Sequence, residues 1–499
     1  MYQRKSTVHD SQSKVERRKA GVWRLAATAV LSVIVLASAL ALTNCGSSRV
    51  EITSNPPRGS VSVSMSDPPV CRFPAGDFKH VYVTVRSVQA HLSSSAGDAA
   101  AGWQEMAPQL ATTPVQLDLL ANPSNGCVLA QLGSNASFPV GDYQQIRLLL
   151  LSNSPSGSDP RPATNNCGSQ GFNCVVLADD SVHQLDLSSQ ANTGLKIPPG
   201  QILGGPLRVG DGQHVDLNID FNTCASLVPQ RNGRFRLRPV LTAGQVGTVT
   251  TGISGQVVDS ATTLAIPNGQ VIVAIEQADS TGLEMVIAQD TADSEGRFNF
   301  CPLPSGTYDI VAVALNADGN TLGATAALNV NAGTAVGKIP VVLGGAAGKI
   351  EGTVTSVAGS SPANIDVAVG ALQFISVPGG TTRQLVIPLL PDSEALLATE
   401  SGAGCPAGTA CAKYTLVVPA SNPSFGVFSF TGTTFSTPAM GDVLYTVEGR
   451  AFLPMSGGTP LCSPSRLTTD KDSTDLPLKA TAGVTVTAKQ LDFTGCTAP

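Results

Sequence analysis

Histidines are the side chains through which this 499-residue chain would most readily hold a metal or relay a proton. The five stand at His9, His80, His91, His183 and His214. No two are three or four residues apart, and no HxH or HExxH pattern occurs, so their spacing predicts no metal site. His183 follows the Asp-Asp-Ser stretch at 179–181 closely. Neighbouring strand residues point to opposite faces and do not form a triad unaided, so we predict a solvated strand or turn there.

Other catalytic motifs are also missing. The chain has no GxSxG elbow, no Walker phosphate loop and no GxGxxG turn opening a βαβ unit. The sequence therefore predicts no catalytic residue, no metal, no cofactor and no enzyme. A closed pocket with convergent carboxylates in residues 58–245 is the finding that would favour an enzyme instead.

Two short polar stretches carry the oxygen ligands that calcium prefers. One holds Asp290, Asp293 and Glu295, and the other places Asn316, Asp318 and Asn320 around Gly319. Neither has the spacing of an EF-hand loop. Clusters of Asp, Asn and Gly are typical of β-turns, so turns are predicted at both places.

Exposed aromatic rings are the groups that would stack on a sugar. The tryptophan and tyrosines that lie mostly inside strand patterns are Trp103, Tyr82, Tyr143, Tyr308, Tyr414 and Tyr445. Those positions predict core packing for each ring.

The first 45 residues differ from the rest. Seven basic and two acidic residues precede Leu25–Leu42, an apolar run of 18 residues without a charge. A basic segment followed by an apolar core and small residues is the pattern of a secretory signal.

The apolar run leads into Leu42-Thr43-Asn44-Cys45, which resembles the lipobox of bacterial lipoproteins. Asn44 stands where that motif prefers Gly or Ala. The resemblance implies that Cys45 is diacylated and becomes the mature N-terminus. Two alternatives stay open: an uncleaved membrane helix with its N-terminus in the cytoplasm, or cleavage to a soluble secreted protein. All three export residues 46–499.

Ten cysteines remain besides Cys45, none of them in a CxxC motif. In an exported protein such cysteines favour disulfides. Cys167 and Cys174, and likewise Cys405 and Cys411, are close enough to close small loops, and Cys462 with Cys496 would tie down the last hairpin. Cys301, after Phe298-Asn299-Phe300, is predicted to be a small buried hydrophobic residue.

The exported part is acidic. Without the leader, the 30 basic and 36 acidic residues of the chain become 23 and 34, a net charge near −11. Because such a surface repels phosphate backbones, we expect no nucleic-acid partner.

Beyond the leader, the chain reads as strands joined by turns. Its 50 Gly and 34 Pro separate short alternating runs such as Val61, Val63 and Met65 among serines, or residues 214–221. Length favours about three domains. We predict an all-β chain of consecutive β-sandwich domains behind a polar spacer at 46–58.

Residues 59–246 are similar to the family known as domain of unknown function 4382. The matching features are the strand at 61–67, the strand at 81–88, Gly102-Trp103, the turn at 139–143 and the closing run at 237–241. Family members are typically bacterial lipoproteins, and the resemblance implies no activity.

Residues 250–345 resemble the carboxypeptidase regulatory-like domain, a seven-stranded transthyretin-like sandwich. The four motifs in order are residues 253–259, 266–271, 290–298 and 303–308. Gly296 is predicted to turn a hairpin with a positive φ. The resemblance implies an appendage without catalysis, in a fold that is grouped with carbohydrate-binding sandwiches.

Residues 347–499 are predicted to be a diverged copy of this sandwich. Residues 350–354 repeat 253–257, and 478–486 resemble 328–336. The copy is longer, mainly through residues 375–425.

These patterns predict a non-enzymatic cell-envelope lipoprotein that displays β-sandwiches for binding, adhesion or structural spacing. The alternative is a carbohydrate-binding protein for polysaccharide capture. The expected partners are the membrane, through the lipid anchor or an uncleaved helix, and a glycan or an envelope protein. The expected location is a cell or outer membrane, facing the periplasm or the exterior.

Overall fold

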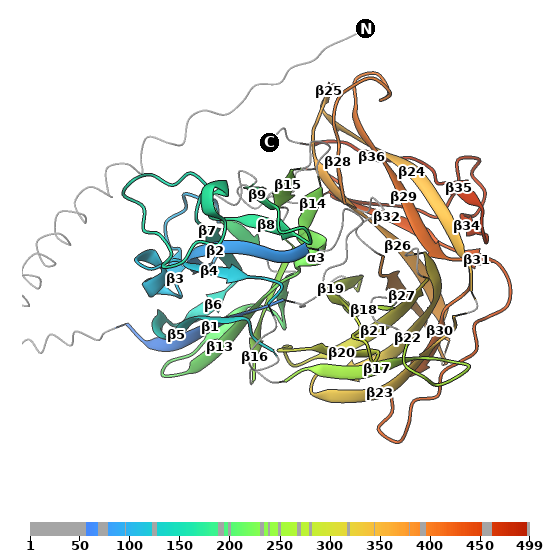
Figure 1. The fold of residues 1–499 in the computed structure, drawn as a ribbon, viewed down its shortest axis with the longest axis horizontal. Helices are drawn as coiled ribbons and strands as arrows, with labels where there is room; N and C mark the ends of the chain where they lie inside the picture. Colours follow the sequence, from blue (N-terminus) through green and yellow to red (C-terminus); the bar gives the residue numbers. More distant parts are fainter. Residues whose placement is uncertain are drawn as a thin grey trace, which may run out of the picture. The chain divides into compact units, whose positions relative to one another are not determined.

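Strands build almost every element of the chain, as predicted (Figure 1). The computed structural model describes residues 56–67, 78–94, 96–121, 127–187, 194–197, 201–229, 234–237, 240–247, 251–266, 271–278, 282–316, 320–343, 345–378, 380–389, 396–451 and 462–496. The leader, Cys45 and the spacer up to residue 55 lie outside these ranges. Residues 57–499 form one compact unit. Among the described residues, no helix is long and apolar enough to cross a membrane.

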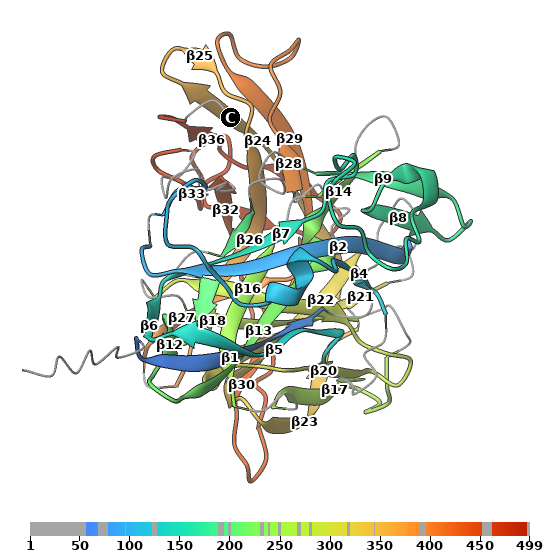
Figure 2. The same cartoon turned by 90° about the vertical axis from the view of Figure 1, so that its left-hand side faces the viewer.

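The first region pairs a five-stranded sheet with a larger sheet (Figure 2). The smaller sheet has the order β11-β16-β13-β1-β5. Its strands are β1 (Arg58–Ser66), β5 (Ala130–Pro139), β11 (Ile202–Leu203), β13 (His214–Phe221) and β16 (Leu241–Val246). Val61, Val63 and Met65 of β1 are fully buried in the core between the sheets. The alternate residues of β1 are serines, which therefore lie on the outer face.

The larger sheet has the order β10-β7-β2-β8-β9-β15-β14, with β3 and β4 also paired to β2. Its strands are β2 (Phe78–His91), β3 (Gln104–Glu105), β4 (Val115–Asp118), β7 (Gln145–Leu150), β8 (Cys174–Leu177), β9 (Val182–Leu187), β10 (Leu195–Ile197), β14 (Leu227–Pro229) and β15 (Phe235–Leu237). A small ribbon joins β6 (Gly141–Tyr143) to β12 (Leu207–Val209). Short helical turns are η2 (Pro108–Ala111), η3 (Gly168–Gln170) and α3 (Thr223–Ser226).

The second region is a sandwich of a three-stranded sheet, β20-β17-β23, and a five-stranded sheet, β19-β18-β21-β22-β30. The strands are β17 (Ile253–Asp259), β18 (Val271–Ala278), β19 (Glu284–Thr291), β20 (Arg297–Phe300), β21 (Thr307–Leu315), β22 (Thr321–Asn331), β23 (Thr334–Val341) and β30 (Ser424–Val427). Gly296 has a φ of 71°, which confirms the predicted hairpin turn. Its missing Cβ would lie 2.3 Å from the Val257 carbonyl oxygen, so the turn also needs glycine for space.

Both faces of the five-stranded sheet are buried. Along β21, Ile310, Ala312 and Ala314 pack into the core of the second region. The alternate residues Val311 and Val313 pack into the core of the third region. A strand covered on both sides has no polar face, which explains why every residue from 308 to 315 is buried.

The third region adds two more sheets, β25-β24-β29 with β35 and β36 on β24, and β27-β26-β32-β33 with β28 on β26. The strands are β24 (Ala347–Ala358), β25 (Ser361–Pro362), β26 (Asp366–Ser376), β27 (Thr382–Ile387), β28 (Leu396–Ala398), β29 (Ala410–Pro419), β32 (Thr446–Ala451), β33 (Arg466–Thr469), β35 (Thr485–Thr487) and β36 (Leu491–Phe493), with β31 (Val443–Leu444) paired to β34 (Lys479–Ala480). The third core therefore draws on strands from both sides of the expected boundary near residue 346.

Parallel pairing of the opening strand occurs in both the second and the third region. In the second region, β17 pairs in parallel with β23, which follows Gly333 at a φ of 85°. In the third region, β24 pairs in parallel with β35, which follows Gly483 at a φ of 69°. Ile253 and Ile350 are both fully buried in these opening strands.

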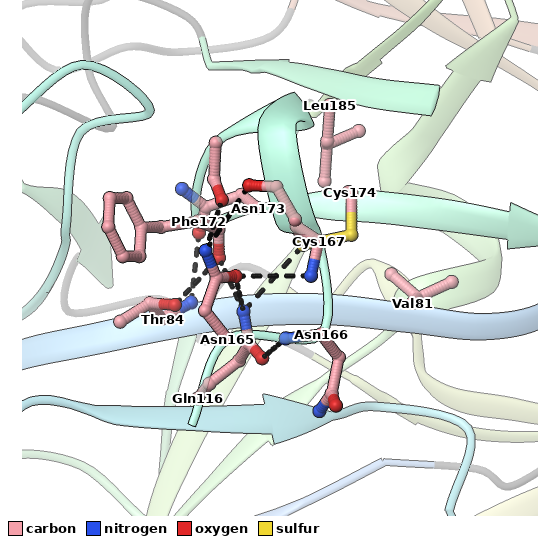
Figure 3. Close-up of a disulfide and its surroundings, with 12 residues drawn as sticks. Val81, Thr84, Gln116, Asn165, Asn166, Cys167, Phe172, Asn173, Cys174 and Leu185 are labelled. Atoms are coloured by element: carbon pink, nitrogen blue, oxygen red, sulfur yellow. Dashed lines mark hydrogen bonds between the residues drawn. A yellow bond between two sulfur atoms is a disulfide. The ribbon is translucent and has the colours of Figure 1, made fainter. Parts of the chain in front are cut away.

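Four disulfides join cysteines of the described part of the chain. The three pairs expected from the sequence are present: Cys167–Cys174, Cys405–Cys411 and Cys462–Cys496. The Cys167–Cys174 disulfide closes a short loop beside β2, with its cysteines seven positions apart in the sequence. In the same place, the Thr84 hydroxyl donates a hydrogen bond of 2.6 Å to the Phe172 carbonyl (Figure 3).

The expectation for Cys301 was wrong. Cys301 is not a free buried thiol but is bonded to Cys127, 174 residues earlier in the chain. The bond joins the first region to the second. Phe298 and Phe300 are buried, so the local sequence pattern resembles that of a buried strand. That pattern gives no information about a cysteine 174 residues away.

Candidate functional site

A ladder of polar side chains covers the outer face of β1 and β13. The two strands are parallel, and their register sets each serine of β1 opposite a polar residue of β13. The four opposed pairs are Ser60 with His214, Ser62 with Asp216, Ser64 with Asn218 and Ser66 with Asp220. Because these residues alternate with core residues, the whole polar set shares one face.

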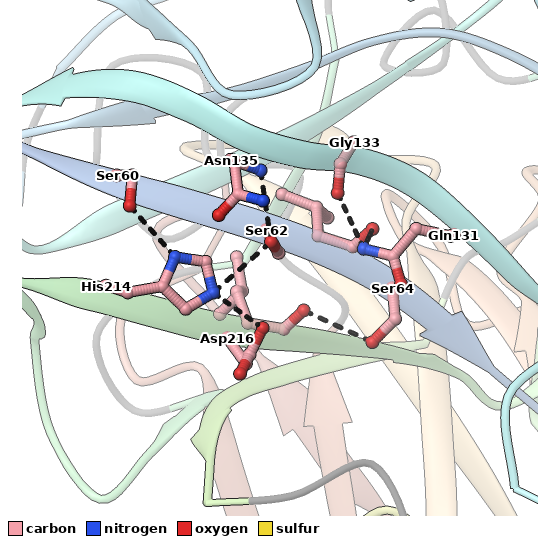
Figure 4. A network of polar contacts seen from close by, with 10 residues as sticks. Ser60, Ser62, Ser64, Gln131, Gly133, Asn135, His214 and Asp216 are labelled. Carbon is pink, nitrogen blue, oxygen red and sulfur yellow. Dashed lines mark hydrogen bonds and ion pairs between the residues drawn. The ribbon is translucent and has the colours of Figure 1, made fainter.

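The exposed end of the ladder contains a serine, a histidine and an aspartate in contact (Figure 4). His214 Nδ1 lies 2.9 Å from Ser60 Oγ, and its Nε2 lies 3.1 Å from Asp216 Oδ1. Ser62 Oγ is 3.4 Å from the same Nε2. A hydrolytic triad also needs donors for the oxyanion. The Ser60 amide donates instead to the Gln213 carbonyl at 2.8 Å, so the nucleophile's own N–H is not available.

Hydrogen bonds continue toward the buried end of the ladder. Ser64 donates to the Asn218 side-chain oxygen at 3.0 Å, and Asn218 donates its amide hydrogen to Ser66 Oγ at 2.8 Å. Ser66 in turn donates to Asp220 Oδ1 at 2.9 Å. Each hydroxyl is therefore fixed as donor toward the next acceptor, and the chain ends on a carboxyl group. The other oxygen of Asp220 has no hydrogen-bond partner in the described part of the structure.

Asp67 lies immediately after β1 and is 6% exposed. Its carboxyl accepts hydrogen bonds from Thr223, through the backbone amide at 3.1 Å and through the hydroxyl. These bonds fix Asp67 beside Asp220. Burial raises the pKa of Asp67 well above its ordinary value, and the negative charges of Asp220 and Asp290 raise it further.

These carboxyls line a cavity of about 920 Å³ between the first and second regions. The first region contributes the ends of β1 and β13 and part of β16. The second contributes the end of β19 and the residues around β20. The Cys127–Cys301 disulfide belongs to the wall, so the two sides are covalently joined next to the cavity.

The second region brings a third carboxyl to the cavity. Asp290, at the end of β19, is 8% exposed and accepts a hydrogen bond from the Thr291 amide at 2.7 Å. The Thr291 hydroxyl is buried without a hydrogen-bond partner among the described residues. Burial raises the pKa of Asp290 to about 7, and burial likewise raises the pKa of Asp220 to about 7.

Asp293 and Glu295 lie in a turn as predicted, whereas Asp290 lies at the end of β19, and Asp318 and Gly319 of the second predicted turn lie outside the described residues. Asp293 Oδ1 accepts hydrogen bonds from the amides of Glu295 and Arg297, each at 2.8 Å. Ser181, next to His183, donates to Asp179 at 2.5 Å within its own turn. Neither group is a metal cage, and in the described ranges no three acidic, histidine or cysteine side chains are placed to hold a metal ion.

The aromatic residues serve mainly the interior. Tyr143, Tyr308, Tyr414 and Tyr445 are buried. Trp103 is partly exposed, but the Arg147 guanidinium covers its ring at 4.0 Å. No aromatic side chain is exposed in the described part of 251–343.

Sequence reasoning missed the three carboxyls of the cavity. Asp220 stands at an outward position of an alternating strand, which ordinarily means contact with solvent. Asp67 ends a strand, and Asp290 appeared only as a turn residue. The available signal was the density of hydroxyl and amide partners opposite them, since these satisfy buried polar groups.

Comparisons with known proteins confirm the resemblance of the first region. Residues 58–239 match the family described as domain of unknown function DUF4382. No curated protein matches the chain.

Solved structures give only distant likenesses. The Bacillus anthracis TIE protein is 11% identical at a TM-score of 0.16, over 88% of this chain and 51% of its own. The shaft pilin SpaA of Lactobacillus rhamnosus GG is 10% identical at 0.17, over 58% and 98%. A DUF3823 family protein from Bacteroides uniformis is 13% identical at 0.15, over 44% and 95%. The chain thus spans about half the length of the TIE protein, and TM-scores this low carry no argument.

Proposed function

We propose that the protein is a non-enzymatic component of the cell envelope, exported and held to a membrane by acylated Cys45. Its β-sheet body displays a binding or adhesion surface or acts as a structural spacer. The observation that carries the proposal is the set of four disulfides. Disulfides persist in oxidising compartments outside the cytosol, in agreement with the secretory pattern of the leader.

The acid-lined cavity supports binding better than catalysis. Carboxyl pairs that catalyse hydrolysis divide the work, because their surroundings push one pKa up and leave the other low. Here burial moves the pKa values of Asp67, Asp220 and Asp290 in the same direction. Each of the three therefore favours its protonated form more than a free carboxyl does.

The polysaccharide alternative finds no support in the described surface. Sugar stacking needs exposed ring faces, and the second region, whose fold suggested that role, exposes none among its described residues. Phe374 and Phe430 are exposed in the third region, at 55% and 83%, but on separate segments. The display and spacing role is therefore the one we retain.

Intact-mass analysis of the membrane-extracted protein tests the anchor. We expect a mature species that begins at Cys45 and carries added acyl mass, and we expect the Cys45→Ala variant to lose that mass. A wild-type protein that keeps its leader or carries no acyl group contradicts the lipoprotein. Alkylation before and after reduction tests the compartment, because exported protein should show the four disulfides already formed.

A further inference from the structure

We propose that the cavity between the first and second regions binds a small organic amine, a cation with an apolar portion. The inference concerns the cavity alone and does not depend on how the N-terminus is anchored. It rests on three features of the wall: unbalanced carboxyls, unused polar atoms and an apolar lining.

Among the described residues, no cationic side chain balances the carboxyls of the cavity. Each carboxyl accepts hydrogen bonds only from neutral groups. The donors are Thr223 for Asp67, Ser66 for Asp220 and the Thr291 amide for Asp290. Over the described ranges, no Lys, Arg or His lies within ion-pair distance of any of the three. Buried acids are ordinarily paired, so this wall has an unmet preference for positive charge.

Two polar atoms at the cavity are left unused. Asp220 Oδ2 and the Thr291 hydroxyl have no hydrogen-bond partner in the described structure, and Thr291 is 8% exposed. A buried polar atom without a partner costs free energy, whereas an ammonium group offers three donors. An amine supplies the kind of donor that each of these two acceptors lacks.

The shape of the wall favours an organic cation over a metal ion. The carboxyls do not converge on a point, since no three metal-ligand side chains group together among the described residues. Much of the remaining wall is apolar and includes Ile287, Phe300 and Leu303. The volume of about 920 Å³ is within the range of small-molecule sites, roughly 300–1,000 Å³.

Charges of both signs lie at the exposed part of the wall. Arg297 and Lys338 are exposed there, together with Asp293. Arg297 is paired with Glu295, and Lys338 extends toward the Thr263 carbonyl at 3.5 Å. These groups are solvated and screened, so they contribute little to the field inside the cavity.

Proton release accompanies binding in this scheme. At pH 6 the free carboxyls of Asp220 and Asp290 are mostly protonated, because burial raises their pKa values to about 7. An ammonium ion favours the ionised carboxylates and so displaces protons. The affinity for an amine should therefore rise as the pH increases from 6 to 8, while a neutral ligand should show no such trend.

Three probes with the same apolar part and different charge test the proposal. Titration calorimetry on the full-length protein would compare 2-phenylethylamine, 2-phenylethanol and phenylacetate at pH 6, 7 and 8. We expect binding of the amine alone, with affinity that rises with pH and heats that depend on the buffer because protons are released. Absence of amine binding up to millimolar concentration, or equal binding of the alcohol, overturns the proposal.

Matched variants locate the site. Asp290→Asn removes the charge but keeps the shape and should weaken amine binding by about tenfold or more. Asp211→Asn, at an exposed position that does not line the cavity, should leave it unchanged. Thr291→Val removes the unused hydroxyl and should weaken binding by a smaller factor. Equal affinity in the wild type and in a folded Asp290→Asn variant places the amine elsewhere and contradicts the proposal.

Discussion

At the scale of single residues, buried acidic side chains make the free energy of unfolding depend on pH. Burial raises the pKa of Asp220 and of Asp290 from 3.8 to about 7. Between pH 4 and 7 the folded protein therefore holds protons that the unfolded chain has released. The contribution of these protonated carboxyls to the free energy of unfolding is complete at a pH below the pKa of the unfolded chain. It disappears as the pH rises through about 7, the pKa in the folded protein.

We predict that Asp290→Asn alters this pH dependence. The variant cannot ionise, so its melting temperature relative to wild type should increase from pH 5 to pH 8 by at least about 2 °C. Differential scanning calorimetry at four pH values measures the change. Asp293→Asn serves as control, because Asp293 is exposed at its turn. A constant difference for Asp290→Asn across this range contradicts the assignment of a raised pKa.

At the scale of elements, the contact between β16 and the loop before β21 leaves no space for a methyl group. A Cβ on Gly244 would lie 2.3 Å from Cγ of Pro304, a ring atom that cannot rotate away. Gly247, three residues later, has nothing within 4 Å of its added Cβ. The two glycines form a matched pair for testing the interface between the first and second regions.

We predict that Gly244→Ala lowers the free energy of unfolding by about 1–3 kcal/mol through overpacking. Gly247→Ala should change it by less than about 0.5 kcal/mol. Urea unfolding followed by tryptophan fluorescence measures both. Similar free energies of unfolding for the two variants would show that the interface accommodates the added methyl group without loss of stability.

Much at this scale could be predicted from the sequence. Alternation predicts β1 and β13, short spacing predicts the Cys167–Cys174 loop, and Gly296 marks its hairpin. Local patterns carry no information on contacts between distant segments. The pairing of β22 with β30 joins residues about 100 positions apart, and the Cys127–Cys301 bond joins residues 174 apart. The cavity shows both cases. Asp67 and Asp220 belong to strands that the sequence predicts, but Asp290 comes from a distant segment whose position beside them the sequence does not indicate.

At the scale of the whole molecule, the second and third regions share a core. The outer face of the five-stranded sheet, with Ile272, Val311, Val313 and Leu328, packs against the third region. The two regions also exchange polar contacts, since the Val386 amide donates to the buried Glu276 carboxyl at 3.0 Å. The sheet is therefore completed only when residues beyond 346 are present.

We predict that a fragment of residues 57–345 exposes this apolar face. It should bind 8-anilinonaphthalene-1-sulfonate strongly and self-associate, while a chain of residues 57–499 should do neither, because large exposed apolar patches drive association. Dye fluorescence and analytical ultracentrifugation compare the two. A monomeric fragment without dye binding would show that the second region is independent of the third.

The disulfides differ in the length of the loop that each one closes. Cys127–Cys301 closes 174 residues and Cys405–Cys411 closes six. Replacing both cysteines of the longer link by serine should cost about 3 kcal/mol more than doing so for the shorter one, by loop-closure entropy. Denaturant unfolding of the two double variants measures the difference, and equal losses would contradict the entropic account.

The long disulfide also determines how the protein would carry tension. A pull on the two ends of the chain passes from Cys127 directly to Cys301 through a covalent bond, so the segment between them bears no load. That segment includes the polar strand β13 and the opening strands of the second region. Reduction would release about 174 residues of slack, roughly 600 Å when extended. Under oxidising conditions the part of the cavity wall that this segment contributes, with Asp220 and Asp290, is thus kept out of the force path, whereas Asp67 precedes Cys127 and bears the load.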